Sequence, residues 1–222
     1  MTTTTARRPK KNLKEDQLVT TTFRVTDWAQ AHFNQVVIGV VALVAVVAIL
    51  VFVANSRESG AKQAEREMGT ALALFTQGEY AAAKTSFQQV GERFGGAQGA
   101  SARFFKAECE LHENNYQQAV DEYDAYLTRA KDYPLFEASA LMGKALAYEG
   151  LENYLEAGNS MAAAVDKMDA KDPRRLDAAF SAGDFYQRAG HAPDAVKYYE
   201  MVAKDATGDL KGRATVAAAM LK

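Results

Sequence analysis

The sequence predicts an all-α protein in which an N-terminal transmembrane helix precedes an α-solenoid of about four helix hairpins and a capping helix. Two observations predict this fold class. Residues 36–54 form an apolar stretch that contains no charge and no proline. Beyond residue 62, a pattern of small, aromatic and alanine residues recurs every 36 to 38 residues, and such a period is typical of stacked helical hairpins.

Residues 1–13 carry a run of threonines and four basic residues but few apolar side chains. A segment with so little to bury cannot offset the entropy of ordering, so we expect a disordered cytoplasmic tail. Its charge also sets the expected orientation. Residues 1–35 carry a net charge of +3 and residues 55–222 one of −5, so the N-terminus should stay cytoplasmic and the C-terminal domain should be extracytoplasmic.

Residues 14–35 interleave apolar and charged side chains at helical spacing. This pattern predicts an amphipathic juxtamembrane helix that lies in the headgroup region. A docking site for a membrane partner is the alternative that the pattern leaves open. The side chains expected at the membrane interface are Leu18, Val25, Trp28 and Phe33.

Residues 36–54 are predicted to form the transmembrane helix. At 1.5 Å per residue they span about 28 Å, close to the hydrocarbon thickness of a bilayer, and a single span must be helical because lipid cannot satisfy backbone polar groups. The triplet Ala54-Asn55-Ser56 fits a cleavage site, so a removed signal peptide is the alternative. The long apolar run and the leader of about 35 residues favour a retained anchor.

Residues 55–222 are expected to form one repeat domain, and the polar segment 55–62 is compatible with a helix that continues from the span. Each repeat closes on an alanine, has a large side chain four residues later and has a small residue twelve residues earlier. The small residue allows the first helix to approach the second closely. The alanines are Ala83, Ala119, Ala157 and Ala195; the large residues are Phe87, Tyr123, Met161 and Tyr199; the small ones are Ala71, Ala107, Ala145 and Gly183.

Residues that favour turns and helix ends divide the repeats. Gly78 and Gly190 are expected to end first helices, Asn115 and Asn153 to cap second helices, and Asp172-Pro173 to open the fourth hairpin. Breaks between hairpins are expected at Gly95-Gly96 and Tyr133-Pro134. A terminal helix from Leu210 to Leu221 should cover the end of the stack, with four residues buried: Val216, Ala217, Met220 and Leu221.

The sequence contains no constellation that points to catalysis. No glycine-rich phosphate loop, nucleophile elbow or metal-ligand spacing is present, so we expect no enzyme activity, no cofactor and no small-molecule substrate. The single cysteine, Cys109, excludes an intramolecular disulfide and is expected to be a buried small hydrophobe. Exposed turns or solvated helix faces are expected for the histidines and for the acidic clusters, namely His32, His112, His191, Glu108, Glu110, Glu113 and residues 121–124.

The repeats resemble the tetratricopeptide repeat, whose signature places small, aromatic, Gly-x-Tyr and alanine positions in a fixed order. The third and fourth hairpins match it best, although the period is longer than 34 residues and no hairpin begins with tryptophan, which leaves open a looser helical-hairpin solenoid. The matching residues are Ala145, Tyr148, Tyr154, Ala157 and Ala164, then Gly183, Tyr186, Gly190, Ala195 and Tyr199.

The whole layout, a short tail with Lys14-Glu15-Asp16, one span and a repeat domain, resembles the bacterial family of ancillary Sec-translocon subunits. The resemblance implies a single-pass protein of the bacterial inner (cytoplasmic) membrane with a periplasmic domain. It also implies association with the protein-export channel and with periplasmic chaperones.

The resemblance to tetratricopeptide repeats further implies a binding groove that is lined by the first helices. An apolar groove with acidic edges would suit an amphipathic or extended peptide; the alternative is that the apolar members are core residues. The acidic domain lacks a basic stripe, which argues against nucleic acid. We therefore expect a non-catalytic scaffold that binds other proteins and the lipid bilayer, or alternatively a structural accessory subunit of a large membrane complex. The predicted groove residues are Met68, Leu72, Phe75, Phe104, Glu108, Leu111, Met142, Leu146, Glu149, Phe180, Asp184 and Gln187.

Overall fold

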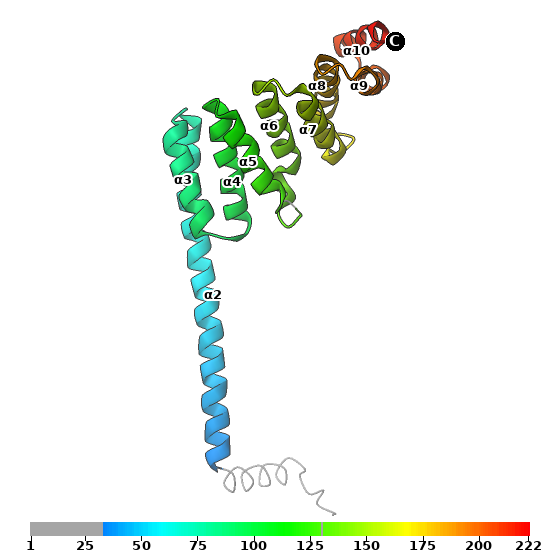
Figure 1. Cartoon of the computed structure of the whole chain (residues 1–222). Helices are drawn as coiled ribbons and strands as arrows, with labels where there is room; N and C mark the ends of the chain where they lie inside the picture. Colours follow the sequence, from blue (N-terminus) through cyan, green and yellow to red (C-terminus); the bar gives the residue numbers. More distant parts are fainter. Residues whose placement is uncertain (1–32, 130) are drawn as a thin grey trace, which may run out of the picture. The chain divides into compact units, whose positions relative to one another are not determined.

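The computed structural model describes the backbone of residues 33–129 and 131–222 and the side chains of residues 43–50, 59–129 and 131–222. Two compact units divide the chain, residues 1–58 and residues 59–222. The described residues contain helices and turns and no strand. The elements are α2 (Phe33–Thr76), α3 (Tyr80–Arg93), α4 (Gly96–His112), α5 (Tyr116–Leu127), the 3₁₀ helix η1 (Pro134–Phe136), α6 (Glu137–Gly150), α7 (Tyr154–Lys167), α8 (Arg175–Arg188), α9 (Ala192–Asp205) and α10 (Gly208–Met220) (Figure 1).

Several N-terminal predictions fall outside the described residues. The tail, and the helix predicted over 14–35 with Leu18, Val25 and Trp28, lie there except for the backbone of residues 33–35, which is helical. The backbone is also helical through 55–62, as the sequence predicts. Among the described residues, no helix is long and apolar enough to cross a membrane. The side chains of residues 36–42 and 51–54 are not among those described, so the transmembrane helix stays a prediction.

Residues 59–222 form four consecutive helix hairpins and a final helix, as the repeat predicts. The C-terminal turns of α2 pair with α3, α4 pairs with α5, α6 with α7 and α8 with α9, and α10 packs against α9. All four closing alanines are fully buried, and the small and large positions of each hairpin are buried with them. The predicted packing within the hairpins is therefore confirmed.

Each hairpin turns at a residue with positive φ. These residues are Gly78 (+80°), Asn114 (+60°), Glu152 (+58°) and Gly190 (+76°), which share one place in the repeat. A side chain with a Cβ atom is strained in this left-handed region, whereas glycine is not. Glu152 is therefore the least suited of the four residues to its turn.

Replacing Glu152 with glycine should stabilise the domain by about 0.5 to 1 kcal/mol, because relief of left-handed strain outweighs the greater freedom of an unfolded glycine. Urea unfolding of the purified chain measures the change. The matched control is Gly190→Ala, which introduces a Cβ at the same turn position and should destabilise by about 1 kcal/mol. Equal signs for the two variants would contradict the strain argument.

Two predicted helix caps differ from those observed. Asn153 does cap α7, because its side chain accepts a hydrogen bond from the Glu156 amide. Asn115 precedes α5 but caps nothing, since its amide donates to Glu110 Oε2 at 2.8 Å. Asp172 accepts a hydrogen bond from the Arg174 amide at 2.9 Å, but this bond belongs to a turn that precedes α8. The helix itself begins at Arg175, so Asp172 is not its N-cap.

The buried face of α10 differs from the predicted one. Ala214 and Ala218 are buried, whereas Val216 and Met220 are 56 % and 80 % exposed. Ala217 and Leu221, which were predicted to be buried, are half-buried and pack against the core. Alanines one helical turn apart let α10 approach α9 closely, and this packing rotates the larger side chains outward.

The core of the repeat domain consists of three clusters along the stack. One joins α2, α3 and α4, a second joins α4, α5 and α6, and the largest joins α6 through α10. Helix α6 belongs to two of them, because Ala140 and Ala147 face the second cluster and Ala145 faces the third. This succession of local cores is characteristic of a solenoid.

Candidate functional site

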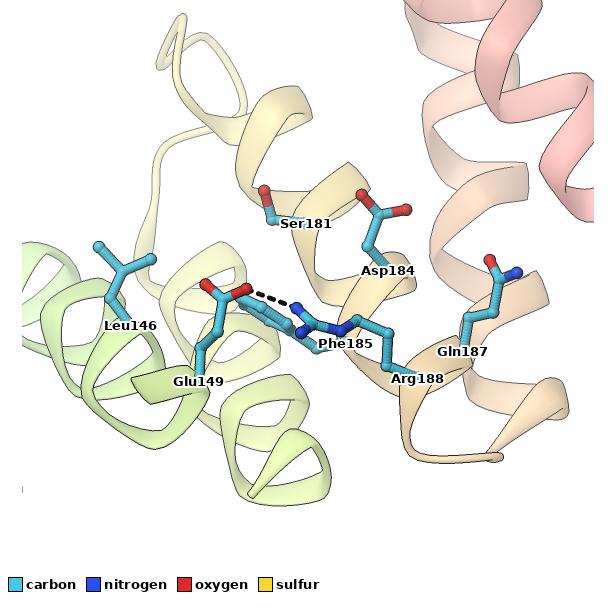
Figure 2. A pocket seen from close by; sticks show the side chains of 7 residues that line it. All are labelled: Leu146, Glu149, Ser181, Asp184, Phe185, Gln187 and Arg188. Atoms are coloured by element: carbon cyan, nitrogen blue, oxygen red, sulfur yellow. Dashed lines mark hydrogen bonds and ion pairs between the residues drawn. The ribbon is translucent and has the colours of Figure 1, made fainter. Parts of the chain in front are cut away.

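A pocket of about 560 Å³ lies between α6 and α8, the first helices of the third and fourth hairpins (Figure 2). Its lining combines apolar, acidic and basic side chains from these two helices. Leu146, which is 45 % exposed, presents an apolar surface to solvent from α6. The lining residues are Leu146, Glu149, Ser181, Asp184, Phe185, Gln187 and Arg188.

An ion pair crosses the pocket from one helix to the other. Arg188 of α8 donates from Nη1 to Glu149 of α6, as the dashed line in Figure 2 shows. The guanidinium carbon of Arg188 also lies 3.9 Å from the ring centroid of Tyr154, on α7. Arg188 thus links three helices, and its charge is matched by that of Glu149.

The second carboxylate of the pocket has no cationic partner among the described residues. The Tyr199 hydroxyl donates to Asp184 Oδ1 at 2.6 Å and also lies 2.8 Å from Gln187 Oε1. The Tyr199 ring is fully buried, so its hydroxyl holds the Asp184 carboxylate in position. Burial, followed by the hydrogen bond to Asp184, raises the pKa of Tyr199 above its ordinary value, which keeps the hydroxyl a donor.

The second hairpin repeats this arrangement. Tyr123 donates to Glu108 Oε1 at 2.6 Å, and the donor again lies fifteen residues after the acid. In the first and third hairpins the equivalent pairs are apolar, Leu72 with Phe87 and Leu146 with Met161. At this position of the repeat, an acid occurs in two hairpins, and in both of them a tyrosine fifteen residues later donates to it.

The raised pKa of Glu108 should make the stability of the domain depend on pH. Burial, the largest cause, raises its pKa above the ordinary glutamate value, although the hydrogen bond from Tyr123 and the nearby His112 act in the opposite direction. Because the folded state keeps this proton to higher pH than the unfolded state, the stability contributed by Glu108 is greatest in acid and declines as the pH rises through the folded pKa. Glu108→Gln removes the titration, so its unfolding midpoint should rise relative to the natural chain between pH 4 and pH 7. A difference that stays constant over this range would contradict the assignment.

The structure distributes the predicted groove residues between the pocket and the core. It brings Leu146, Glu149, Asp184 and Gln187 together at the pocket. Met68, Phe104 and Phe180 are buried in the core clusters. The other five are half-buried beside those clusters: Leu72, Phe75, Glu108, Leu111 and Met142.

Sequence reasoning missed three lining residues, Ser181, Phe185 and Arg188. A signal for Arg188 was present, because it follows Asp184 by four residues and so lies on the same helix face. Phe185 is buried at the base of the pocket and has no such signal in the sequence alone.

The expected solvated face of α4 is wrong at Glu110. This residue is 8 % exposed and lies 3.2 Å from Lys84 Nζ of α3. His112 and His191 are exposed as expected, with the His112 ring stacked on Tyr80, and His32 lies outside the described residues. Cys109 is buried as expected, and burial raises the pKa of its thiol to about 12.

Known proteins provide the family context for these repeats. A family model described as a tetratricopeptide repeat matches residues 68–134, and no curated protein matches the chain. Among solved structures, TPR-like repeats described as a kinesin light chain of Podosopora anserina share 16 % identity, with 71 % of this chain and 84 % of that chain covered and a TM-score of 0.56. Residues 41 to the end of MamA from Desulfovibrio magneticus RS-1 share 23 % identity over 64 % of this chain and 74 % of that chain, with a TM-score of 0.52.

At such identities the similarity to these structures concerns the fold. It agrees with the hairpins, the buried alanines and the left-handed turns described above. The repeats of residues 59–222 therefore form a tetratricopeptide-like α-solenoid.

Proposed function

We propose that this chain is a non-catalytic, membrane-anchored scaffold that binds a segment of another protein at the pocket between α6 and α8. The observation that carries the binding role is the pocket itself. It places an exposed leucine, Leu146, beside two carboxylates whose positions are fixed by neighbouring side chains. Concave sites that combine apolar surface with oriented polar groups are typical of ligand recognition.

The membrane anchor rests on the apolar sequence of residues 36–54. Support comes from residues 43–50, in which large apolar side chains are exposed around the helix, with Leu43 at 64 % and Leu50 at 62 %. Exposed apolar surface of this extent is characteristic of contact with lipid or with another protein. The charge balance on either side supports a position of the repeat domain outside the cytoplasm.

We further propose that the scaffold acts in protein export at the translocon of the bacterial inner membrane, with its repeats in the periplasm. The layout of tail, span and repeat domain supports this assignment by its resemblance to ancillary translocon subunits. A role as an accessory subunit of another membrane complex is the second candidate. The exposed Val216 and Met220 at the end of the stack favour it, because a permanent neighbour would cover them.

Site-specific crosslinking tests the binding role. A photoreactive amino acid at Leu146 in the full-length chain, in intact membranes, should yield crosslinks to other proteins. The matched control is Gln117, which is exposed on α5 outside the pocket and should yield few. If Leu146 gives only lipid or self crosslinks, the pocket does not bind protein. Stoichiometric co-purification of one complex in mild detergent would instead favour the accessory-subunit role.

Protease accessibility tests the orientation. Protease added outside spheroplasts of a bacterial host should degrade residues 62–222 and spare the N-terminal tail. Survival of the repeat domain with loss of the tail would reverse the orientation, and extraction of the whole chain by alkaline carbonate would contradict the anchor.

A further inference from the structure

The pocket between α6 and α8 contains a carboxylate whose negative charge is not paired within the described part of the chain, and this charge indicates which kind of ligand the pocket binds. Glu149 is matched by Arg188, which is itself held against Tyr154. Asp184 forms no ion pair among the described residues and is oriented by Tyr199. One carboxylate of the pocket therefore lacks a counter-charge, and it lies in a site that also presents Leu146.

The neighbouring cation does not supply that counter-charge. The guanidinium carbon of Arg213, on α10, lies 4.5 Å from the ring centroid of Phe180. Phe180 precedes Asp184 by one helical turn, but Arg213 forms no ion pair with Asp184 among the described residues. The hydroxyl that donates to Asp184 Oδ1 holds the carboxylate in place and does not neutralise it. The carboxylate of Asp184 is thus an acceptor for a cationic group.

The apolar and acidic positions lie on the two helices that line the pocket. Leu146 and Asp184 lie 38 residues apart and occupy the same place in consecutive hairpins. The Glu149–Arg188 ion pair joins these two helices across the pocket, and both Leu146 and Asp184 line it. One short extended ligand can therefore meet both positions.

We propose that this pocket recognises an extended protein segment that carries a lysine or arginine close to a large apolar residue, with the basic group at Asp184 and the apolar one at Leu146. This specificity rests on the proposed binding function of the pocket. It commits the site to a basic and apolar segment, and it excludes acidic segments, which the unpaired Asp184 would repel.

A peptide pool provides the test. The full-length chain in mild detergent is incubated with a random pool of nine-residue peptides without cysteine, and the bound peptides are identified by mass spectrometry. We expect enrichment of peptides that contain both a lysine or arginine and a nearby leucine, methionine or phenylalanine. In Asp184→Asn, which keeps an oxygen acceptor for Tyr199, the preference for basic residues should fall about fivefold. In Leu146→Ser, the apolar preference should fall while the basic preference remains.

The control variant is Asp121→Asn, which removes one exposed carboxylate from α5 outside the pocket. It should bind the same peptides as the natural chain. Bound peptides without a basic preference, or the same preference in Asp184→Asn, would overturn the inferred specificity and leave the binding function standing. Failure of the natural chain to retain any peptide would overturn both.

Discussion

Replacing Lys84 with methionine should destabilise the repeat domain by about 3 kcal/mol. Lys84 of α3 is the cation that accompanies the buried carboxylate of Glu110, at 3.2 Å, and it also donates to Glu113. Both acids lie at the C-terminal end of α4, the first helix of the next hairpin, so methionine would leave two neighbouring carboxylates without a cation. Removal of one partner from a buried pair is costly because the remaining charge stays desolvated.

The hydrogen bonds around Lys84 sharpen this expectation. Those to Glu113 and Glu110 raise the pKa of Lys84 above that of a free lysine, with burial acting in the opposite direction. The stability that the ammonium contributes is thus present at neutral pH and is lost only as the pH rises through this elevated pKa. Asn115 Nδ2 cannot replace it, because it already donates to Glu110.

Urea unfolding at pH 7 provides the measurement. The triple variant Lys84→Met, Glu110→Gln, Glu113→Gln should recover most of the loss, because no charge is then left unpaired. The matched control is Lys222→Met, whose pair with Glu200 is exposed on both sides and should contribute at most about 0.5 kcal/mol. A cost for Lys84→Met as small as that of the control would show that the buried pair is not a stabilising element.

The sequence was sufficient to predict the hairpins, because one small set of positions repeats at a nearly constant spacing. Ala83 and Phe87, for example, are separated by one helical turn, and the residues at these two positions of the repeat are buried in every hairpin. Packing inside a hairpin is a local property, so the helical period determines it. The turns at Gly78 and Gly190 were predictable for the same reason.

Contacts between hairpins were less predictable, because they join residues far apart in sequence. Glu110 lies three residues after the buried Ala107, so its inward direction could have been found from the helical period. Its partner Lys84 lies 26 residues away on another hairpin, and no local rule links the two. Asn115 was expected to cap a helix, but the charge of Glu110 offers its amide a stronger acceptor.

The candidate site shows the same division. Leu146 and Asp184 could be placed in the groove by their position in the repeat, and both line the pocket. The pairing of Glu149 with Arg188 could not be predicted, since it depends on the distance between α6 and α8. That pairing determines which carboxylate remains available to a ligand.

Replacing Gly143 with alanine should destabilise the domain by about 2 kcal/mol, because it disturbs the contact between α5 and α6. A Cβ atom on Gly143 of α6 would lie 2.3 Å from the Tyr123 hydroxyl oxygen and 2.4 Å from the carbon that bears it. The Tyr123 ring is fully buried on α5, and its hydroxyl is held by Glu108 at 2.6 Å, so the ring cannot move aside freely. The cost of overpacking should exceed the gain in helix propensity of about 1 kcal/mol.

The solenoid should restrict this effect to the contact between the second and third hairpins. Stability in a repeat array is close to a sum of hairpin terms and nearest-neighbour terms, and α5 and α6 form the contact that the new methyl group would disturb. Relative to the natural chain, hydrogen exchange should therefore show a greater loss of protection in α5 and α6, which form this contact, than in α8 and α9. Gly212→Ala in α10, which meets nothing within 4 Å, is the matched control and should stabilise by up to about 1 kcal/mol.

The clash with Tyr123 can be separated from any other consequence of the alanine at residue 143. Met161 occupies the place of Tyr123 in the next hairpin, so methionine is compatible with that position of the repeat. Methionine is flexible and can yield to a new methyl group, whereas a held tyrosine ring cannot. In a Tyr123→Met background, Gly143→Ala should therefore cost less than half of its cost in the natural chain, as a double-mutant cycle would measure. An unchanged cost would mean that the ring of Tyr123 is not what requires glycine at residue 143.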